Sequence, residues 1–207
     1  MMVYLVRHGE SVSNVGRYFP DEDNPSSLTE TGHRQAAEIA DVISKLNVQM
    51  VFSSPMLRTR ETAQHISNKL GVEVQVASEL REVGLGKLAG RKYPEVLSED
   101  PMWYMEYFDS TNRYGLEKFG DVVKRVSSFI ERISPQADSA VLVSHVEPIR
   151  AAVCACLGAH GSWVRRLRIS NASITVVHYA GGRFRLGSVN WLPATHYVNQ
   201  FPVQQKG

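Results

Sequence analysis

The sequence predicts a three-layer α/β/α sandwich built on a mainly parallel sheet. Short apolar runs alternate along the chain with longer segments whose apolar residues recur at helical spacing, which is typical of α/β folds. The runs Val3–Val6, Met50–Ser53 and Ala140–Val143 have the character of buried strands. The last two predicted strands form a hairpin, which we expect to add an antiparallel edge to the sheet.

The predicted elements follow one another in a simple alternation. In chain order they are strand Val3–Val6, helix Thr29–Leu46, strand Met50–Ser53, a helix from Pro55 to Leu70, strand Val72–Val76, helix Phe119–Ile133, strand Ala140–Val143, a helix from Pro148 to Leu157, and strands Ser173–Tyr179 and Arg183–Val189. Pro55 and Pro148 are placed at helix starts because proline suits the first turn, and Gly71 is placed as a helix stop. Gly181 and Gly182 supply the hairpin turn.

Composition indicates an ordinary globular protein. The 207 residues, 43% of them hydrophobic, suffice for one domain spanning 1–207, with a short cap or lid insertion at about 83–117. The formal charge of +2 and the single basic cluster, Arg165, Arg166 and Arg168, favour a solvated face over a nucleic-acid site. Met1–Val6 is too short for a signal sequence and no stretch is apolar enough to span a membrane, so we expect a cytoplasmic protein.

The cysteines and most histidines carry no sign of a metal or cofactor site. Cys154 and Cys156 are two residues apart on a predicted helix, so they point in different directions and are expected to pack as small apolar groups. No ligand spacing connects the remaining histidines, which are His33, His65, His160, His178 and His196. We therefore expect neither a metal nor a cofactor.

Several charged residues fall at the ends of predicted strands. Arg7 and His8 follow the first strand, Glu82 follows the strand Val72–Val76, and His145 ends the strand Ala140–Val143, while Arg58 lies in the first turns of the helix after Ser53. Ligands bind α/β sheets in the crevice beyond the strands' carboxyl ends, so these side chains should surround one crevice. Arginine offers a planar fork to phosphate oxygens and histidine a nitrogen nucleophile, so the sequence indicates phosphate chemistry.

With these residues in place, the chain resembles the histidine phosphatase superfamily, the phosphoglycerate mutase-like proteins. The matching motifs are Arg7-His8-Gly9-Glu10-Ser11 with Asn14, Leu28-Thr29-Glu30-Thr31-Gly32 with Gln35-Ala36, Ser53-Ser54-Pro55 with Leu57, Arg58, Thr62 and Ala63, Leu80 and Glu82 with Gly86, Ser144-His145 with Arg150, and the segment Asn171–Val176. The resemblance covers nearly the whole chain and implies a phosphoglycerate mutase-like fold.

The resemblance also implies roles for the site residues. His8 attacks phosphorus and becomes a phosphohistidine, and Glu82 protonates the leaving oxygen. The phosphoryl group is held by Arg7, Asn14, Arg58, His145 and the backbone N–H of Val146. These roles agree with elementary chemistry, because cationic groups offset the phosphate charge and a carboxylic acid beside a dianion keeps its proton more readily.

Other interpretations of single residues stay open at this point. Arg58 alternatively pairs with Glu61 or Glu82, Asn14 alternatively closes a turn, and Glu79 lies near enough in sequence to be confused with Glu82. Many members of this family carry glycine after the second histidine, whereas this chain has Val146, whose β-branched side chain tolerates positive φ poorly. Glu147, next along, either repels a second acidic group of the substrate or binds a hydroxyl or an amine.

The interpretation that follows is a metal-independent phosphomonoesterase that acts on small phosphate esters through a phosphohistidine. The alternatives are a cofactor-dependent phosphoglycerate mutase and, from another class, a non-catalytic module that binds phospho-ligands. A mutase usually has a longer insertion than the region Val83–Gly115, whose aromatic residues Trp103, Tyr104, Tyr107 and Phe108 either cover the pocket or pack on the sheet. The expected partner is a small phosphate ester, with neither nucleic acid nor membrane, and a homodimer is one option for the assembly.

Overall fold

The computed structural model describes residues 1–20, 25–158 and 161–193 of the chain. Its helices and strands are, in order, β1 (Met2–Arg7), α1 (Val12–Gly16), α2 (Glu30–Ile43), β2 (Met50–Ser53), α3 (Leu57–Leu70), β3 (Val74–Val76), α4 (Tyr93–Glu99), α5 (Phe119–Ile133), β4 (Ser139–Ser144), α6 (Val146–Leu157), β5 (Ile174–Ala180) and β6 (Arg183–Trp191). Short 3₁₀ helices cover Ser78–Leu80, Gly86–Leu88, Trp103–Tyr107 and Ser162–Arg166.

The strands form one sheet in the order β3-β2-β4-β1-β5-β6. The first four in this order run parallel, whereas β5 pairs antiparallel with β1 and β6 antiparallel with β5. In the centre of the sheet, Arg7 at the end of β1 lies opposite Ser144 at the end of β4. The prediction of a mainly parallel sheet with an antiparallel edge is therefore confirmed, and the two central strands end side by side.

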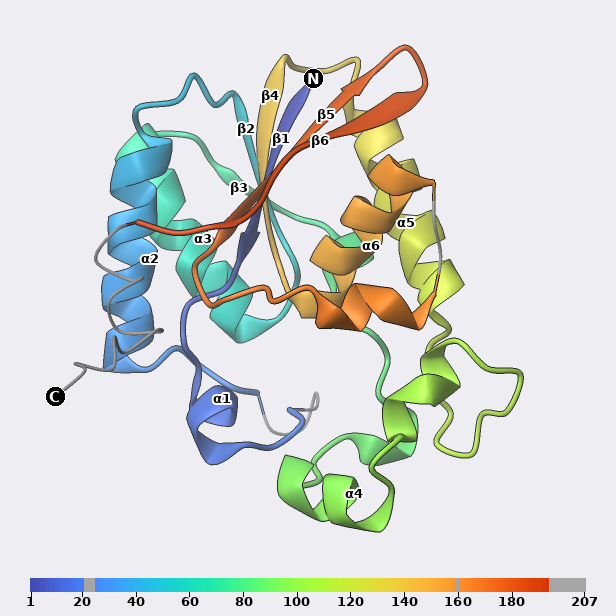
Figure 1. Cartoon of the computed structure of the whole chain (residues 1–207). Helices are drawn as coiled ribbons and strands as arrows, with labels where there is room; N and C mark the ends of the chain where they lie inside the picture. Colours follow the sequence, from blue (N-terminus) through green and yellow to red (C-terminus); the bar gives the residue numbers. More distant parts are fainter. Residues whose placement is uncertain (21–24, 159–160, 194–207) are drawn as a thin grey trace, which may run out of the picture.

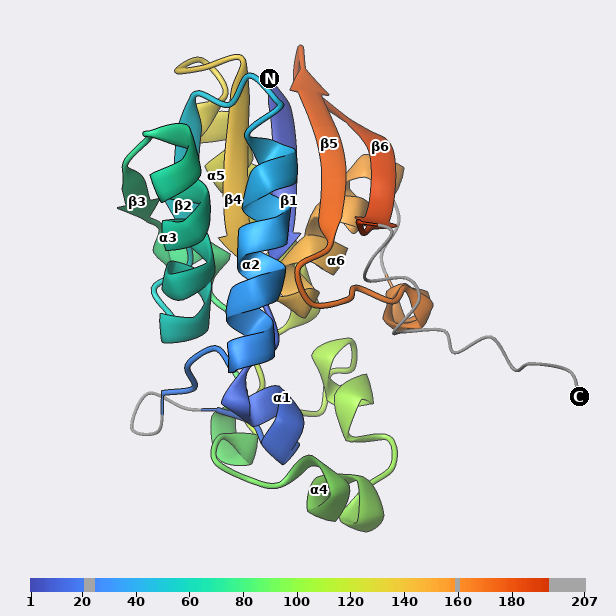
Figure 2. The same ribbon diagram turned by 90° about the vertical axis from the view of Figure 1, so that its left-hand side faces the viewer.

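Helices cover both faces of the sheet, which confirms the three-layer sandwich. In Figure 1, α2 and α3 lie on one side of the strands and α5 and α6 on the other, and Figure 2 shows the same arrangement after a quarter turn. Every residue of β4 is buried, because its side chains point alternately to the two faces of the sheet and helices cover both. Leu142 belongs to the hydrophobic cluster between the sheet and α5 and α6, whereas Val141 and Val143 belong to the cluster between the sheet and α2 and α3.

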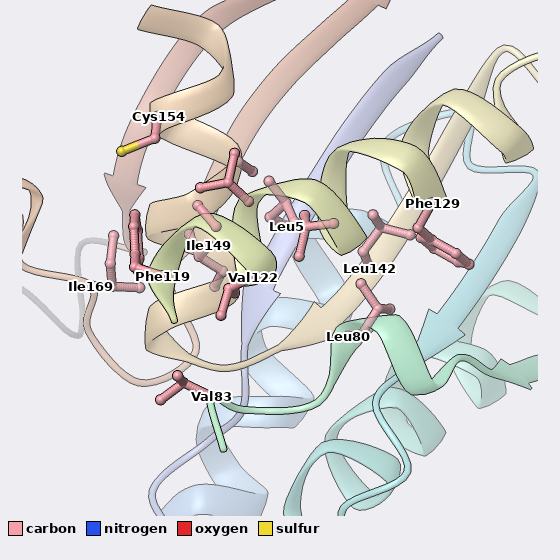
Figure 3. Close-up of a cluster of buried hydrophobic side chains, with 14 of the residues drawn as sticks. Leu5, Leu80, Val83, Phe119, Val122, Phe129, Leu142, Ile149, Cys154 and Ile169 are labelled. Atoms are coloured by element: carbon pink, nitrogen blue, oxygen red, sulfur yellow. The ribbon is translucent and has the colours of Figure 1, made fainter. Parts of the chain in front are cut away.

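The larger of these clusters lies between the sheet and the helices α5 and α6 (Figure 3). Val122 and Phe129 of α5 and Ile149 of α6 pack there against Leu5 and Leu142 of the strands. The spacing of the buried residues along α5 matches the helical period that the sequence displays. This packing fixes the positions of the carboxyl ends of β1 and β4.

Several element boundaries differ from the prediction. Thr29 precedes α2, because its hydroxyl accepts the backbone N–H of Gly32 as an N-cap, and the helix ends at Ile43 instead of Leu46. The helix expected from Pro55 begins at Leu57, the helix expected from Pro148 begins at Val146, and the strand expected from Val72 begins at Val74. Pro148 lies inside the first turn of α6, where proline is tolerated, and Pro55 lies just before the N-cap of α3, so each proline marks the neighbourhood of a helix start and not its first residue.

The sequence pattern predicts neither of the two short helices, α1 and α4. Helix α1 has five residues and α4 has seven, too few to show a period. The region 83–117, which contains α4 and two of the 3₁₀ helices, lies together with α1 beyond the carboxyl ends of the central strands (Figures 1 and 2). We call residues 83–117 the cap.

Candidate active site

The loop after β1 is locked in place by two glycines. A Cβ atom on Gly9 would lie 2.5 Å from the carbonyl oxygen of Gly32, and one on Gly32 would lie 2.0 Å from that of Glu10. The backbones of the loop and of the start of α2 therefore touch directly. Thr62 of α3 adds a third support, because its hydroxyl accepts the N–H of Gly9 at 3.1 Å. These contacts give a physical reason for the two glycine-containing motifs of the sequence.

His8 is buried and its ring has a defined tautomer. Nδ1 lies 2.7 Å from the carbonyl oxygen of Gly9, which can only accept, so Nδ1 carries the hydrogen. Nε2 accepts a hydrogen bond from Nε of Arg58 at 3.2 Å, so it carries the lone pair. Burial, together with the charges of Arg58 and Arg7, holds the pKa of His8 well below its ordinary value. A neutral imidazole whose Nε2 carries the lone pair is the form that acts as a nucleophile.

Arg58 is the centre of the site. It lies in the first turn of α3, is 4% exposed, and donates through Nε to His8 and through Nη2 to Nδ1 of His145 at 3.1 Å. Its Nη1 is buried without a hydrogen-bond partner, and so is Nε of Arg7. Buried guanidinium donors without acceptors are costly, so both arginines are ready to receive an anion. Arg58 is directed to the two histidines inside the site and is buried, whereas Glu61 accepts the N–H of Leu28, so the structure does not form the alternative surface pair of Arg58 with Glu61.

Burial also weakens the basicity of these arginines. Desolvation lowers the pKa of Arg7 to about 10, a shift to which the charges of Arg58, Arg150 and Arg168 also contribute. The pKa of Arg58 is lowered for the same principal reason. Both groups keep their positive charge at neutral pH.

His145 lies behind Arg58 and not on the cavity wall. It follows β4, directly before α6, and its ring meets that of His8 edge-on, with the centroids 5.2 Å apart. Nδ1 accepts from Arg58, so Nε2 carries the hydrogen and donates it to the hydroxyl of Ser54 at 2.9 Å. Burial and the charge of Arg58 hold its pKa well below the ordinary value. In this arrangement His145 orients Arg58, and its direct contact with a phosphoryl group stays a prediction.

Val146, the residue that departs from the family pattern, causes no backbone strain. It is the first residue of α6 and has helical geometry, so the anticipated conflict with positive φ does not arise. It lines the cavity, at the helix end where the backbone N–H groups lack intrahelical partners and attract anions.

Glu82 is held in the cavity by its neighbours. Leu80 and Val83 are buried in the large core cluster on either side of it (Figure 3), and the hydroxyl of Ser144 donates to the carbonyl of Leu80 at 2.6 Å. The pKa of Glu82 is raised, first by burial and second by the negative charge of Glu147. Glu79, by contrast, lies outside the cavity and pairs with Arg132. The geometry thus separates the two carboxylates that the sequence leaves close together.

Asn14 belongs to the site through a partner to which the sequence analysis assigned no role. Its Oδ1 accepts hydrogen bonds from the N–H of Ser11 at 3.1 Å and from Nδ2 of Asn171 at 2.9 Å. Asn171 also donates to the backbone carbonyls of His8 and Gly9, each at 3.2 Å. With Oδ1 occupied, Asn14 has only its amide hydrogens left for the cavity that it lines.

These residues open onto a cavity of about 560 Å³. Arg7, His8, Asn14, Arg58 and Glu82 are among the residues that line it. The lining also includes apolar and aromatic residues from the cap and the loop after α1, which are Tyr18, Phe19, Leu85, Tyr93, Trp103 and Tyr107. For the aromatic residues of the cap, the sequence left open whether they cover the pocket or pack on the sheet. Trp103 and Tyr107 do both, because they line the cavity and are also buried in the large core cluster.

Arg165 has a role in the site that its place in a basic run does not indicate. The solvated-face interpretation fits Arg166 and Arg168, which are exposed, but Arg165 lines the cavity and its Nη1 donates to Glu147 at 3.0 Å. Glu147 also accepts from Nη1 of Arg150 at 2.9 Å. Glu147 therefore binds two arginines of its own chain, a possibility that was not considered. A run of basic residues in a sequence gives no signal of such a partner.

Other expectations concern metals, membranes and cysteines. Within the described ranges, no three His, Cys, Asp or Glu side chains are grouped so that they could hold a metal ion. No helix in the same ranges has the length and apolarity to cross a membrane. Cys154 is buried and Cys156 partly buried on α6, both as free thiols. His160 and His196 lie outside the described residues.

Comparisons with known proteins agree with this geometry. The sequence model of the histidine phosphatase superfamily (branch 1) matches residues 3–192. The chain is 35% identical over 199 residues to a 2,3-bisphosphoglycerate-dependent phosphoglycerate mutase of Thermoplasma acidophilum, a match that covers 94% of this chain and 96% of that protein.

Two solved structures extend the comparison to the fold. A mycobacterial glucosyl-3-phosphoglycerate phosphatase complexed with VO3 superposes with a TM-score of 0.82 at 26% identity, covering 91% of this chain and 98% of that one. A mutant phosphoserine phosphatase from Entamoeba histolytica in complex with phosphoserine gives a TM-score of 0.76 at 26% identity, covering 91% and 96% of the two chains. In sequence and in fold, the chain belongs to the histidine phosphatase superfamily.

Proposed function

We propose that this protein is a metal-independent phosphomonoesterase that works through a phosphohistidine on His8. The observation that carries the proposal is the tautomer of His8: Nδ1–H is held by a carbonyl, and the Nε2 lone pair faces a guanidinium. A structural histidine has no need of a lone pair held beside two arginines with unsatisfied donors. The same arrangement fits a nucleophile that waits for an anionic ester.

In the proposed first step, Nε2 of His8 bonds to phosphorus and the ester oxygen leaves with its electron pair. Arg7 and Arg58 bind the equatorial oxygens, where charge accumulates during phosphoryl transfer. Asn14 and the N–H of Val146 add neutral donors. His145 supports the set through its hydrogen bond with Arg58, and its direct contact with the phosphoryl group is what the family resemblance implies. The leaving alkoxide takes the proton of Glu82, whose raised pKa favours the protonated form.

In the second step, water attacks phosphorus while Glu82, now ionised, accepts its proton. Inorganic phosphate leaves and His8 returns to the neutral form. No metal enters this scheme, since Arg58 already supplies a positive charge between the two histidines.

A second candidate function, phosphoglycerate mutase, is favoured by the relative from Thermoplasma acidophilum, whose name states that activity. A mutase must also bind the carboxylate of its substrate, which calls for free cationic donors in the cavity. Glu147 occupies Nη1 of both Arg150 and Arg165, and the backbone carbonyls of Leu167 and Arg165 take the other donors of Arg150. This pairing reduces the number of donors that Arg150 and Arg165 offer to a carboxylate, whereas Arg17 and Arg81, which also line the cavity, are the cations that a mutase would use.

The deciding experiment measures two products in parallel. Release of inorganic phosphate is followed over a panel of phosphate esters, and conversion of 3-phosphoglycerate to 2-phosphoglycerate is followed with and without 2,3-bisphosphoglycerate. We expect phosphate release that is lost in His8→Asn. Isomerisation that outpaces hydrolysis would establish the mutase instead, and binding of vanadate without either reaction would indicate a binding module.

A further inference from the structure

Glu147 touches the proposed acid and also places a charge beside it. Its backbone N–H donates to Oε1 of Glu82 at 3.2 Å. Glu147 is 6% exposed. Its carboxylate oxygen Oε1 accepts hydrogen bonds from Nη1 of Arg150 at 2.9 Å and from Nη1 of Arg165 at 3.0 Å. Arg165 in turn lies over an aromatic ring of the cap, with its guanidinium carbon 4.5 Å from the centroid of Tyr104. Glu147 is thus held from two sides.

The hydrogen bonds of Glu82 distinguish its two oxygens. The N–H groups of Val83, at 2.9 Å, and of Glu147, at 3.2 Å, both donate to Oε1. In a protonated carboxyl group, the oxygen that accepts such bonds is the carbonyl oxygen, and the other one carries the hydrogen. The proton of Glu82 is therefore assigned to Oε2, the oxygen to which neither N–H donates.

The surroundings of Glu82 contain an electrostatic conflict. Positive charge near a carboxyl group favours its ionised form, as does the amino end of a helix. The charged and titratable groups that act on Glu82 come from five elements: Arg7 of β1, Arg58 of α3, Tyr107 of the cap, Arg125 of α5, which binds its backbone carbonyl, and Glu147 of α6. Among these, Glu147 is the carboxylate, and its negative charge opposes the arginines.

We propose that Glu147 is a positioning residue for this reaction: its N–H, together with that of Val83, leaves the proton of Glu82 on Oε2, and its carboxylate retains that proton against Arg7 and Arg58. The inference rests on the proposed role of Glu82 as the acid. Glu147 itself touches no reacting atom.

The substitution Glu147→Gln separates the two parts of this role. It keeps the backbone N–H and removes the charge. The amide oxygen can still accept from the arginines, and the amide nitrogen replaces Oε2, which is buried without a partner. Glu131→Gln, at an exposed position of α5, is the matched control.

The primary readout is the titration of Glu82 by NMR of ¹³C-labelled glutamate carboxyls, with Glu82→Gln used for assignment. We expect Glu147→Gln to shift this titration down by about one pH unit, and Glu131→Gln to leave it unchanged. The basic limb of kcat/KM for glycerol 2-phosphate should move by the same amount, because activity requires the protonated acid. The ionisation of the substrate is common to all variants and does not contribute to the difference.

An unshifted titration in Glu147→Gln overturns the inference, even in an active enzyme. A shifted titration in a protein that hydrolyses no ester refutes the proposed function and leaves the electrostatic role standing. Should Glu147→Gln fail to fold, Glu147→Met decides, because it also removes the carboxylate at similar side-chain length while it keeps the backbone N–H, and must therefore move the titration of Glu82 to lower pH. A shift to higher pH, or none, in that variant contradicts the proposal.

Discussion

Replacement of Glu82 by glutamine removes the proposed acid with little other change. The amide oxygen of the new side chain can accept the N–H groups that Oε1 accepts now, from Val83 and Glu147. The flanking core residues are unchanged. We therefore expect the variant to fold with a stability within about 1 kcal/mol of the original, in the range of an uncharged hydrogen bond. What it lacks is a transferable proton at the site of the leaving oxygen.

The expected kinetic loss depends on the leaving group. For an alkyl phosphate the alkoxide needs the proton, so kcat/KM should fall by about 10²–10⁴-fold, equivalent to about 3–5 kcal/mol of transition-state free energy. For p-nitrophenyl phosphate the phenolate leaves without help, and the fall should stay below about tenfold. The quantity to measure is kcat/KM, because kcat also includes hydrolysis of the phosphohistidine, in which Glu82 acts as the base.

The assay compares four reactions: glycerol 2-phosphate and p-nitrophenyl phosphate, each with Glu82→Gln and with Glu79→Gln. Glu79 pairs with Arg132 away from the cavity, so its variant should lose less than about threefold on both substrates, as expected for a partly exposed ion pair. Equal losses on both esters in Glu82→Gln would refute the role of the acid. A leaving-group effect in Glu79→Gln instead would mean that the acid lies three residues earlier.

Three further predictions concern the nucleophile, its inhibitors and its protonation. His8→Asn should abolish turnover and leave the circular dichroism spectrum unchanged. Phosphate bound in an acid-labile, base-stable form should be trapped on the wild-type enzyme but not on the variant. Activity of His8→Asn above about 1% of the wild-type value would exclude His8 as the nucleophile. Activity should survive EDTA and be inhibited by vanadate, which can adopt the geometry of the transferring group between Arg7 and Arg58; loss with EDTA and recovery with magnesium would contradict the mechanism. His8 and His145 resist protonation in the folded protein, so acidification from pH 7 to 5.5 protonates them only in the unfolded chain and should lower the unfolding free energy by about 1.2 kcal/mol for each. Glu82 has a raised pKa in the folded protein, so its contribution to the unfolding free energy increases as the pH falls over the same range. In urea denaturation, His8→Asn should show a weaker pH dependence than wild type, and an equal dependence would mean that His8 is not held neutral.

Much of the site could be predicted because strand ends are easy to recognise in a sequence. The apolar runs before Arg7 and His145 locate the end of the sheet, and the alternation of strands and helices makes those ends neighbours. The period of α5 was equally clear, since it extends over fifteen residues. Boundaries were less predictable, as Val146 shows: the helix begins two residues before Pro148 because proline fits anywhere in the first turn.

The parts that escaped prediction depend on contacts between distant segments. Arg165 has the appearance of a surface residue in its basic run, and only the fold brings it to Glu147, 18 residues away. Asn171 supports the loop at His8 from 163 residues further along the chain. Such partners leave no periodic trace in the sequence, and neither do α1 and α4, which are too short to repeat a pattern.

The guanidinium that covers Nε2 of His8 should make this proposed nucleophile selective about its electrophile. A lone pair that accepts a hydrogen bond cannot form a new bond until the donor moves away. An anionic ester draws Arg58 toward its own oxygens, because a charged acceptor binds a guanidinium more strongly than a neutral ring nitrogen does. An uncharged alkylating reagent does not attract Arg58, so Nε2 of His8 stays hydrogen-bonded and its lone pair is not available to the reagent. We therefore expect His8 to resist alkylation by iodoacetamide and to be phosphorylated readily by phosphoramidate. Without an anionic phosphoryl donor, its ring should react slowly with electrophiles.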